Sequence, residues 1–429
     1  MKNILLPAFC LLFLTQLSAQ KYLPDSIQSS LGSLIHEEYN RIYYADSSAG
    51  FIAFINKLDS LYHGEQDRIH IMHIGGSHIQ ADLYPNKLRE YLRNMGPCYE
   101  APRGLIFPYR LAGTNNPLNY SITGNREKWK RFRSPVKSDS ASWGITGITV
   151  RLDAFSDTLV IRANNKNQTL KPYYFDKIRI LTDSDTAFYR LEIVDSRVLI
   201  VSDTLMAAYA IREYTLSDTL QTATLIIRYA DSAYQGKFNL MGIELVNPNP
   251  GIQYTSIGVN GASFESWARC RLFQQQLNFY KPDLFIVSVG TNDAYTTTFD
   301  SEKFRSSYKA MLEMVKISNP GCALLLTVPN DSYYRRKAPN KNTRIQQEII
   351  HSLAKEYHAV VWDFYAVMGG LGSSQRWYLH KMMPRDRVHF TTTGYSLKAD
   401  LLLKALVTLW EESCGYDANS MLRAITGKR

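Results

Sequence analysis

The fold is most constrained by short apolar runs that alternate along the chain with stretches of helical periodicity. Because most of these runs are continuous rather than interleaved with polar residues, they are typical of parallel strands covered on both faces. The strand-length runs lie at 68–74, 254–257, 284–289, 323–328 and 359–362. Helix-like stretches lie at 80–94, 264–280, 301–317, 343–356 and 393–412. This order predicts a doubly wound α/β sheet whose ligand crevice lies at the carboxyl ends of the strands.

Residues 121–251 interrupt this α/β pattern. Short strand-like runs, among them TLVIRAN at 158–164 and DKIRILTD at 176–183, are separated by Asp, Ser, Asn and Gly turn signals. We therefore expect an all-β sandwich inserted into the α/β domain. The expected division is a discontinuous α/β domain at 20–120 and 252–415, the insertion at 121–251, and a polar tail at 416–429.

The first 19 residues have the layout of a secretory signal. Lys2 precedes an apolar run from Ile4 to Leu17, and the small residues Ser18 and Ala19 follow it. The run is shorter than the roughly 20 residues that span a bilayer, so a membrane anchor is the weaker interpretation. We expect an exported protein, periplasmic or secreted, with no transmembrane span after signal removal.

Four cysteines follow the signal, which is too few for a disulfide framework in so long a chain. They are Cys98, Cys270, Cys322 and Cys414, and they allow three pairings if both bridges form. The hydrophobic core must therefore hold the fold.

The chain has a formal net charge of +10, and basic residues gather in two clusters. Such clusters attract anionic polymers, although a solvated loop gives the same pattern. The first cluster surrounds Trp129 and contains Arg126, Lys128, Lys130, Arg131 and Arg133. The second contains Arg335, Arg336 and Lys337. No nucleic-acid-binding motif or zinc-ligand spacing accompanies them, and an exported protein rarely meets nucleic acid. Nucleic acid is therefore excluded as a partner.

Two glycines and a serine interrupt the chain at the end of the first predicted parallel strand. Gly75 and Gly76 permit a tight turn, and Ser77 stands at the start of the next helix. A serine there projects into the crevice, where a helix N-terminus favours the negative charge that develops when an ester carbonyl is attacked. Taken alone, the pattern also fits an ordinary N-capping serine.

Three other features stand at strand ends or helix starts of the same sheet. Gly261 in IGVNGASF can present an unobstructed backbone N–H to an oxyanion, and the Asn292 side chain in VGTND offers a second donor. A plain turn and a helix cap are the structural alternatives for these two residues. In RDRVHF, one tight loop can place the Asp386 carboxylate behind the His389 imidazole. His389 is then the candidate general base for Ser77, and Asp386 orients its ring.

The four blocks GGSH, VNGAS, GTND and DRVH resemble, in this order, those of the SGNH (GDSL-type) hydrolase family. The resemblance covers roughly 70–120 and 252–412. It implies a flavodoxin-like three-layer fold and serine esterase chemistry that uses no cofactor and no metal. The serine, histidine and aspartate named above would form the catalytic triad.

The resemblance also implies an oxyanion hole formed by the backbone amides of Ser77 and Gly261 with the Asn292 side chain. The chain departs from the family at Gly76, where an aspartate that supports the loop is usual. This departure bears on the rate more than on the mechanism, because that aspartate is not a triad member. No GxSxG pentapeptide occurs, which argues against the nucleophile elbow of α/β-hydrolases.

The β-rich segment between GGSHIQAD and VNGAS also looks like the peptidoglycan O-acetylesterase branch of this family, in which a carbohydrate-binding-like jelly roll interrupts the catalytic domain. Trp143, Tyr173, Tyr174 and Phe175 offer rings that can stack on sugars, but packing in the sandwich core is the favoured interpretation for most of them.

The other histidines are weaker candidates for chemistry. His70 and His73 are interleaved with isoleucines on the first strand and are interpreted as hydrogen-bonded structural residues. His78 is close enough to the serine in sequence to contact a substrate. His380 competes poorly with His389 as the base, because no aspartate stands three residues before it.

These observations favour an exported serine esterase that removes O-acetyl groups from a polysaccharide, with peptidoglycan as the preferred polymer. Its partner is then an acetylated polysaccharide. Two other functions stay open: a glycan O-acetyltransferase that uses the same triad, and a glycan-binding protein that retains the fold without turnover.

Overall fold

The computed structural model describes residues 32, 34–44, 48–95, 100–165, 171–195 and 197–427. The predicted signal at 1–19 and Cys98 lie outside these residues. Cys270, Cys322 and Cys414 are free thiols. Among the helices of the described residues, none is long and apolar enough to cross a bilayer.

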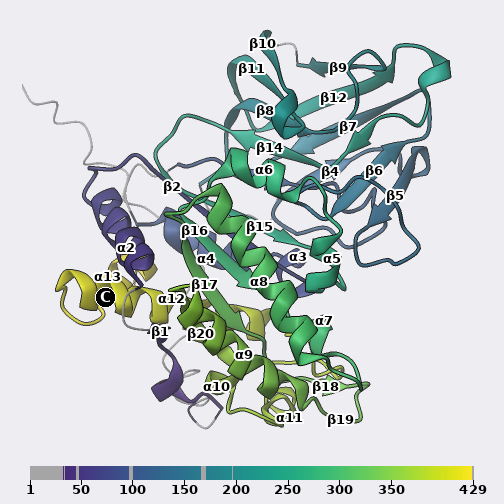
Figure 1. Cartoon of the computed structure of the whole chain (residues 1–429). Helices are drawn as coiled ribbons and strands as arrows, with labels where there is room; N and C mark the ends of the chain where they lie inside the picture. Colours follow the sequence, from purple (N-terminus) through teal and green to yellow (C-terminus); the bar gives the residue numbers. More distant parts are fainter. Residues whose placement is uncertain are drawn as a thin grey trace, which may run out of the picture.

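A six-stranded sheet forms the centre of the α/β part of the described chain (Figure 1). In spatial order its strands are β1 (Ile42–Tyr44), β20 (Val360–Asp363), β17 (Ala323–Val328), β16 (Leu284–Ser288), β2 (Arg68–Gly75) and β15 (Gly251–Gly258). All neighbours pair in parallel except β1, which pairs antiparallel with β20 at one edge. Numbered along the chain, the parallel strands have the order 2-1-3-4-5 of a flavodoxin-like sheet. The order reverses between β2 and β16, and ligands of such sheets bind at this switch point.

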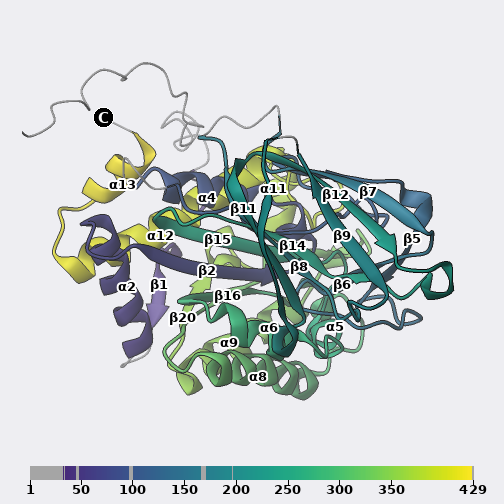
Figure 2. The ribbon, with the colours of Figure 1, turned by 90° about the horizontal axis from the view of Figure 1, so that it is seen from above.

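Helices cover both faces of this sheet, because successive strand residues point to opposite sides. In β16, Leu284 and Ile286 belong to one buried cluster, and Phe285 and Val287 belong to another. The first cluster includes side chains of α2 (Ala49–Tyr62), α4 (Tyr84–Arg93) and α12 (Thr392–Cys414), and the second those of α6 (Phe273–Tyr280), α8 (Ser301–Ser318) and α9 (Asn342–Glu356). Figure 2 shows α8 and α9 on one side of the sheet and α4 and α12 on the other.

Shorter helices follow the strands or end the chain. They are α3 (Ser77–Gln80), α5 (Phe264–Ala268), α7 (Thr291–Ala294), α10 (Phe364–Met368), α11 (Ser373–Leu379) and α13 (Ser420–Thr426). A small ribbon pairs β18 (Tyr333–Tyr334) with β19 (Ala338–Pro339), and the second basic cluster, at 335–337, forms its turn.

The chain between β2 and β15 contributes strands to three antiparallel sheets. One has the order β10 (Ile200–Met206), β11 (Ile211–Leu220), β8 (Phe175–Leu181), β14 (Gly242–Val246) and β3 (Gly104–Ile106). A second has the order β4 (Ser121–Thr123), β7 (Ser156–Arg162), β12 (Thr222–Tyr229) and β9 (Tyr189–Val194). A third has the order β13 (Asn239–Leu240), β6 (Ile148–Leu152) and β5 (Trp129–Arg133).

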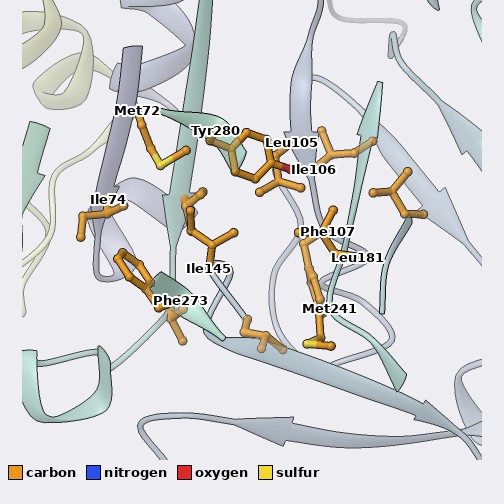
Figure 3. Packing of buried hydrophobic residues seen from close by; sticks show 14 of the residues in the cluster. Met72, Ile74, Leu105, Ile106, Phe107, Ile145, Leu181, Met241, Phe273 and Tyr280 are labelled. Atoms are coloured by element: carbon orange, nitrogen blue, oxygen red, sulfur yellow. The ribbon is translucent and has the colours of Figure 1, made fainter. Parts of the chain in front are cut away.

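A common core joins these sheets to the α/β part. Figure 3 shows Met72 and Ile74 of β2 in the same apolar cluster as Ile145, Leu181 and Met241 of the antiparallel region. The predicted fold class, an α/β domain interrupted by an all-β insertion, is confirmed. The domain boundaries stay a prediction, and β3, which lies before residue 121, pairs with β14.

The expected polar tail at 416–429 is wrong for the residues that form α13. Met421, Leu422 and Ile425 of this helix are buried in the cluster that contains α12. Glu411 of α12 accepts hydrogen bonds from the backbone N–H groups of Met421 at 2.8 Å and Leu422 at 3.2 Å. These bonds satisfy donors that a helix N-terminus leaves open, so α13 packs as part of the fold.

Candidate active site

Close backbone packing holds Ser77 at the carboxyl end of β2. Ser77 begins α3, and α3 lies directly against the end of β15. A Cβ at Gly258 would lie 2.6 Å from the backbone carbonyl carbon of Ile79, and a Cβ at Gly75 would lie 2.7 Å from the Ser288 carbonyl oxygen. Only glycine fits at these two positions. β2 ends at Gly75 and β15 ends at Gly258, so no side chain at either end blocks the approach of α3. Ser77 therefore stands at the switch point of the sheet.

Three side chains from two distant segments form a continuous hydrogen-bonded chain. Ser77 Oγ lies 2.9 Å from His389 Nε2, and His389 Nδ1 lies 2.9 Å from Asp386 Oδ2. Ser77 and His389 are 312 residues apart in the sequence. The structure thus brings together the three residues predicted as a catalytic triad.

The loop before α12 keeps the Asp386 carboxylate ionised. Its Oδ1 accepts from the backbone N–H groups of Val388 at 2.9 Å and His389 at 3.0 Å, and Arg387 turns the loop with a φ of 53°. Burial acts to raise the pKa of Asp386, but hydrogen bonds from the His389 ring and the two amides outweigh it and lower the pKa to about 2. An ionised carboxylate only accepts hydrogen bonds, so Nδ1 carries the ring hydrogen. Nε2 then accepts from the Ser77 hydroxyl.

Gly261 and Asn292 line the same cavity as Ser77 and His389, which has a volume of about 390 Å³. Asn292, in α7 after β16, donates from Nδ2 to the Ala262 carbonyl at 2.9 Å. This bond orients the amide and leaves its second hydrogen for an oxyanion. Gly261 has a φ of 85°, a conformation that glycine adopts without strain. Both predicted oxyanion residues therefore reach the pocket of the serine.

Gly76 leaves space beside the Asn292 amide. A Cβ at Gly76 would lie 3.2 Å from Asn292 Nδ2, which is closer than an ordinary van der Waals contact. The family usually has aspartate at this position. Glycine here avoids a close contact between a Cβ and the side-chain amide of Asn292, a candidate oxyanion donor.

Asn115 and Asn260 also line the cavity, although the sequence pattern does not single them out. Asn260 Nδ2 donates to Asn115 Oδ1 at 2.7 Å, and the Asn260 N–H donates to Gln80 Oε1 at 2.7 Å. Gln80 Nε2 donates in turn to the Thr114 hydroxyl at 2.9 Å and the Asn115 carbonyl at 3.0 Å. Asn260 stands in the VNGAS block next to Gly261, whereas Asn115 lies in a loop without a recognisable motif.

The other histidines have structural surroundings. The His78 ring centroid lies 5.3 Å from that of His389, and His78 Nδ1 lies 3.0 Å from the Tyr395 hydroxyl. Burial, with nearby positive charges, lowers the pKa of His78 well below its ordinary value, so it packs as a neutral ring behind the base. The ring nitrogens of His70 and His73 are hydrogen-bonded, as the structural interpretation requires. In the described part of the chain, no three His, Cys, Asp or Glu side chains are grouped to hold a metal ion.

Most of the singled-out aromatic residues belong to the core. Trp143, Tyr173 and Phe175 are buried, whereas Tyr174 has 36% of its surface exposed. Core packing is therefore confirmed for three of the four, and these rings are not free to stack on a sugar.

A family model matches the part of the chain that carries four of the five candidate site residues. Residues 230–397 match the model of the GDSL-like lipase/acylhydrolase family. The matched segment contains Gly261, Asn292, Asp386 and His389, and Ser77 precedes it. This segment of the chain is therefore similar to GDSL-like lipases and acylhydrolases.

Several solved structures are similar to all or part of this chain. A peptidoglycan O-acetylesterase has a TM-score of 0.69 and 19% sequence identity, over 86% of this chain and 99% of that chain. An acetyl xylan esterase has a TM-score of 0.30 and 20% identity, over 36% of this chain and 81% of that chain. The lipase/acylhydrolase from Enterococcus faecalis has a TM-score of 0.29 and 17% identity, over 39% of this chain and 79% of its own. Among curated protein sequences, none matches the chain.

Proposed function

We propose that this protein is an exported serine esterase that removes O-acetyl groups from a polysaccharide, with peptidoglycan as the preferred polymer. The observation that carries the proposal is the hydrogen-bonded chain of Ser77, His389 and Asp386, which opens into one cavity with Gly261 and Asn292. The GDSL-like acylhydrolase match supports ester chemistry. Similarity to a peptidoglycan O-acetylesterase along 86% of the chain supports the choice of polymer.

In the first step, Ser77 Oγ attacks the acetyl carbonyl carbon. As the new C–O bond forms, His389 Nε2 takes the hydroxyl proton, and Asp386 stabilises the resulting imidazolium. The carbonyl oxygen becomes an oxyanion that accepts hydrogen bonds from the backbone amides of Ser77 and Gly261 and from the Asn292 side chain. A donor that is held in place before the reaction lowers such a barrier by about 3 kcal/mol.

In the second step, the imidazolium gives its proton to the departing sugar oxygen. The ester C–O bond breaks, the free sugar hydroxyl leaves, and the acetyl group stays on Ser77. His389 then takes a proton from a water molecule, which attacks the acetyl carbonyl. Collapse of the second oxyanion releases acetate and returns the proton to Ser77.

The lining of the cavity favours a sugar as the alcohol part of the ester. Asn115, Asn260 and Asn292 all line the cavity. An amide group both donates and accepts hydrogen bonds, which matches the hydroxyl groups around a sugar ring. Together these amides would orient an acetylated sugar with its ester toward Ser77.

The release of acetate from O-acetylated peptidoglycan, measured beside acetylated xylan, tests the proposed function. We expect faster release from peptidoglycan, and a fall in kcat of at least about 10⁴ in Ser77→Ala, because the variant has no nucleophile. Folding of the variant is checked by circular dichroism. Faster release from xylan would overturn the choice of polymer, and transfer of acetyl to added free glycan would identify a transferase. A folded wild-type protein that releases no acetate from either polymer would contradict the esterase.

A further inference from the structure

A second hollow lies on the antiparallel region, beside the first basic cluster. It has a volume of about 350 Å³ and is lined by Leu111, Arg126, Trp129, Lys130, Arg131 and Phe132. Most of its wall is β5, the edge strand of its sheet, which lies at the far end of the molecule from α13 in Figures 1 and 2. We refer to it as the arginine pocket.

The basic residues around the arginine pocket divide into two kinds. Lys130 is paired with Asp153 at 2.8 Å, and Lys128 reaches Asp157 at 3.8 Å. In the described part of the chain, by contrast, no carboxylate lies within salt-bridge distance of Arg126 or of its neighbour in the pocket, Arg131. The two arginines therefore retain charges that the protein itself does not neutralise.

The guanidinium groups of Arg126 and Arg131 both lie close to the backbone of Gly113. A Cβ at Gly113 would overlap the Arg131 guanidinium and would lie 3.1 Å from Arg126 Nη2. Gly113 has a φ of 71°, so both its conformation and this contact favour glycine. Two like charges held side by side repel each other, and an anion between them removes that repulsion. The planar donor pairs of arginine suit a carboxylate, which can accept two parallel hydrogen bonds.

One short loop connects the arginine pocket with the candidate active site. Leu111 lines the arginine pocket, and Asn115 lines the cavity of Ser77. Only one residue separates Gly113 from Asn115, so their backbone positions lie within about 7 Å of each other. The bonds from Gln80 and Asn260 hold Thr114 and Asn115 in place. A single glycan chain is long enough to occupy both hollows at once.

We propose that Arg126 and Arg131 bind a carboxylate of the same polysaccharide whose acetyl ester lies at Ser77. This proposal rests on the proposed function and narrows its substrate class to acetylated glycans that carry carboxylates. The carboxylate is borne either by a sugar of the polymer or by a peptide attached to it. The arginine pocket thus selects the polymer, while the cavity at Ser77 performs the reaction.

Steady-state kinetics of the double variant Arg126→Gln/Arg131→Gln test this proposal. The substrates are O-acetylated peptidoglycan, the same polymer with its peptides removed by an amidase, neutral acetylated glucomannan, and p-nitrophenyl acetate. On the intact polymer we expect KM to rise about tenfold or more at unchanged kcat, because charge-assisted hydrogen bonds are lost. Hydrolysis of glucomannan and of p-nitrophenyl acetate should not change. Added salt should raise the wild-type KM on the intact polymer more than that of the variant.

The amidase-treated polymer identifies the source of the carboxylate. A raised KM on both forms of the polymer assigns the carboxylate to a sugar, and a raised KM on the intact form alone assigns it to the peptide. Arg190→Gln, which removes an exposed arginine elsewhere on the antiparallel region, is the matched control and should leave every KM unchanged. An unchanged KM of the double variant on both forms, or an equal rise on glucomannan, would overturn the proposal.

A binding measurement separates this proposal from the esterase proposal. Sedimentation of Ser77→Ala protein with insoluble O-acetylated peptidoglycan measures affinity without turnover. If the arginine pocket binds the polymer, adding the two Arg→Gln substitutions to Ser77→Ala should weaken binding about tenfold, even if the wild-type protein proves to have no esterase activity. Equal binding with and without the two arginines would rule out the arginine pocket.

Discussion

His389 is the residue on which the candidate chemistry converges, since each of its ring nitrogens has a defined partner. The ionised Asp386 accepts from Nδ1, and Ser77 lies within hydrogen-bonding distance of Nε2. The same carboxylate also accepts from two backbone amides, so its orientation does not depend on the ring alone. The tautomer needed by a general base is therefore set by the loop before any substrate binds.

Asp386→Asn should lower kcat by about 10⁴ with little change in KM. The amide can present an N–H to Nδ1, which favours the wrong ring tautomer and leaves Nε2 unable to accept the serine proton. Steady-state kinetics on a soluble acetyl ester measure the effect, and circular dichroism checks the fold. A loss of less than tenfold would show that Asp386 does not orient the base.

Asp293, which follows Asn292 in α7, should make stability fall as the pH rises. Burial raises the pKa of this carboxyl from 3.8 to about 7, although the Phe264 N–H donates to it. Between about pH 4 and pH 7 the folded chain thus holds a proton that the unfolded chain releases. Asp293→Asn removes this titration, so its Tm should depend less on pH over that range. Burial also raises the pKa of Glu90 to about 7. The pH dependence of the Tm of Glu90→Gln is therefore compared with that of Asp293→Asn. Equal Tm slopes for Asp293→Asn and wild type would refute the assignment.

At the scale of elements, the contact between α3 and β15 positions the serine. Gly258→Ala would place a methyl group against the backbone of Ile79 and Gln80. We expect a loss of about 1–3 kcal/mol or more in the free energy of unfolding, because backbone on both sides limits relaxation. Urea unfolding measures the loss, and kcat should fall as α3 is displaced. Gly321→Ala is the control, since a Cβ there meets its nearest atom at 3.6 Å. Unchanged stability and activity in Gly258→Ala would argue against this positioning role.

The sequence predicts the elements of the α/β part well where the signal is local. Continuous apolar runs locate β16 and β17, because strands covered on both faces need apolar residues at every position. The expected helix at 264–280 instead divides into α5 and α6. Between them, Arg269 donates to the Ser134 and Val136 carbonyls, and the Leu272 N–H donates to the Trp143 carbonyl. These partners lie more than 120 residues away, so no local pattern reveals the break.

The strand β11 is missed for a different reason. In IREYTLSDTL, polar and charged residues interrupt the apolar ones, and Ser217 and Asp218 look like a turn signal. Pairing with β10 and β8 on its two sides nevertheless places β11 inside a sheet. Strand formation here depends on tertiary pairing rather than on an intrinsic preference of the segment.

At the scale of the whole molecule, the buried carboxylate of Asp82 links the α/β part to the chain that enters the insertion. Asp82 lies 3.0 Å from both Arg89 and Arg103, and the Asn119 side chain donates to it at 2.7 Å. Arg89 belongs to α4, whereas Arg103 directly precedes β3 and Asn119 stands just before β4. The segment that carries the candidate nucleophile is thus fixed to the edge of the antiparallel region.

Asp82→Asn should destabilise the protein by about 3–5 kcal/mol, because two buried arginines lose their carboxylate. Asp82 has a φ of 49°, which asparagine tolerates, so the substitution tests the charge rather than the backbone. Urea unfolding gives the free energy. Asp153→Asn, which breaks the exposed pair with Lys130, should cost less than about 1 kcal/mol. Similar small losses in both variants would show that the buried network does not hold the two parts together.

The candidate site could be predicted from the sequence to the extent that its residues stand at strand ends. Ser77, Gly261 and Asn292 follow parallel strands, and parallel topology brings such ends to one edge of a sheet. Asn115 lies in the loop that leads into the insertion, and Arg126 and Arg131 lie in the insertion itself. Their position depends on how the insertion docks, which no spacing within the sequence encodes.

The proposed chemistry requires that Ser77 is a nucleophile activated by His389. Mass spectrometry of the protein after reaction with a fluorophosphonate probe tests it most directly, because the probe reacts with activated serines and its site is mapped by peptide analysis. We expect one adduct, on Ser77, which is absent in Ser77→Ala and forms much more slowly in His389→Ala. An adduct on another serine, or no adduct on folded wild-type protein, would contradict it.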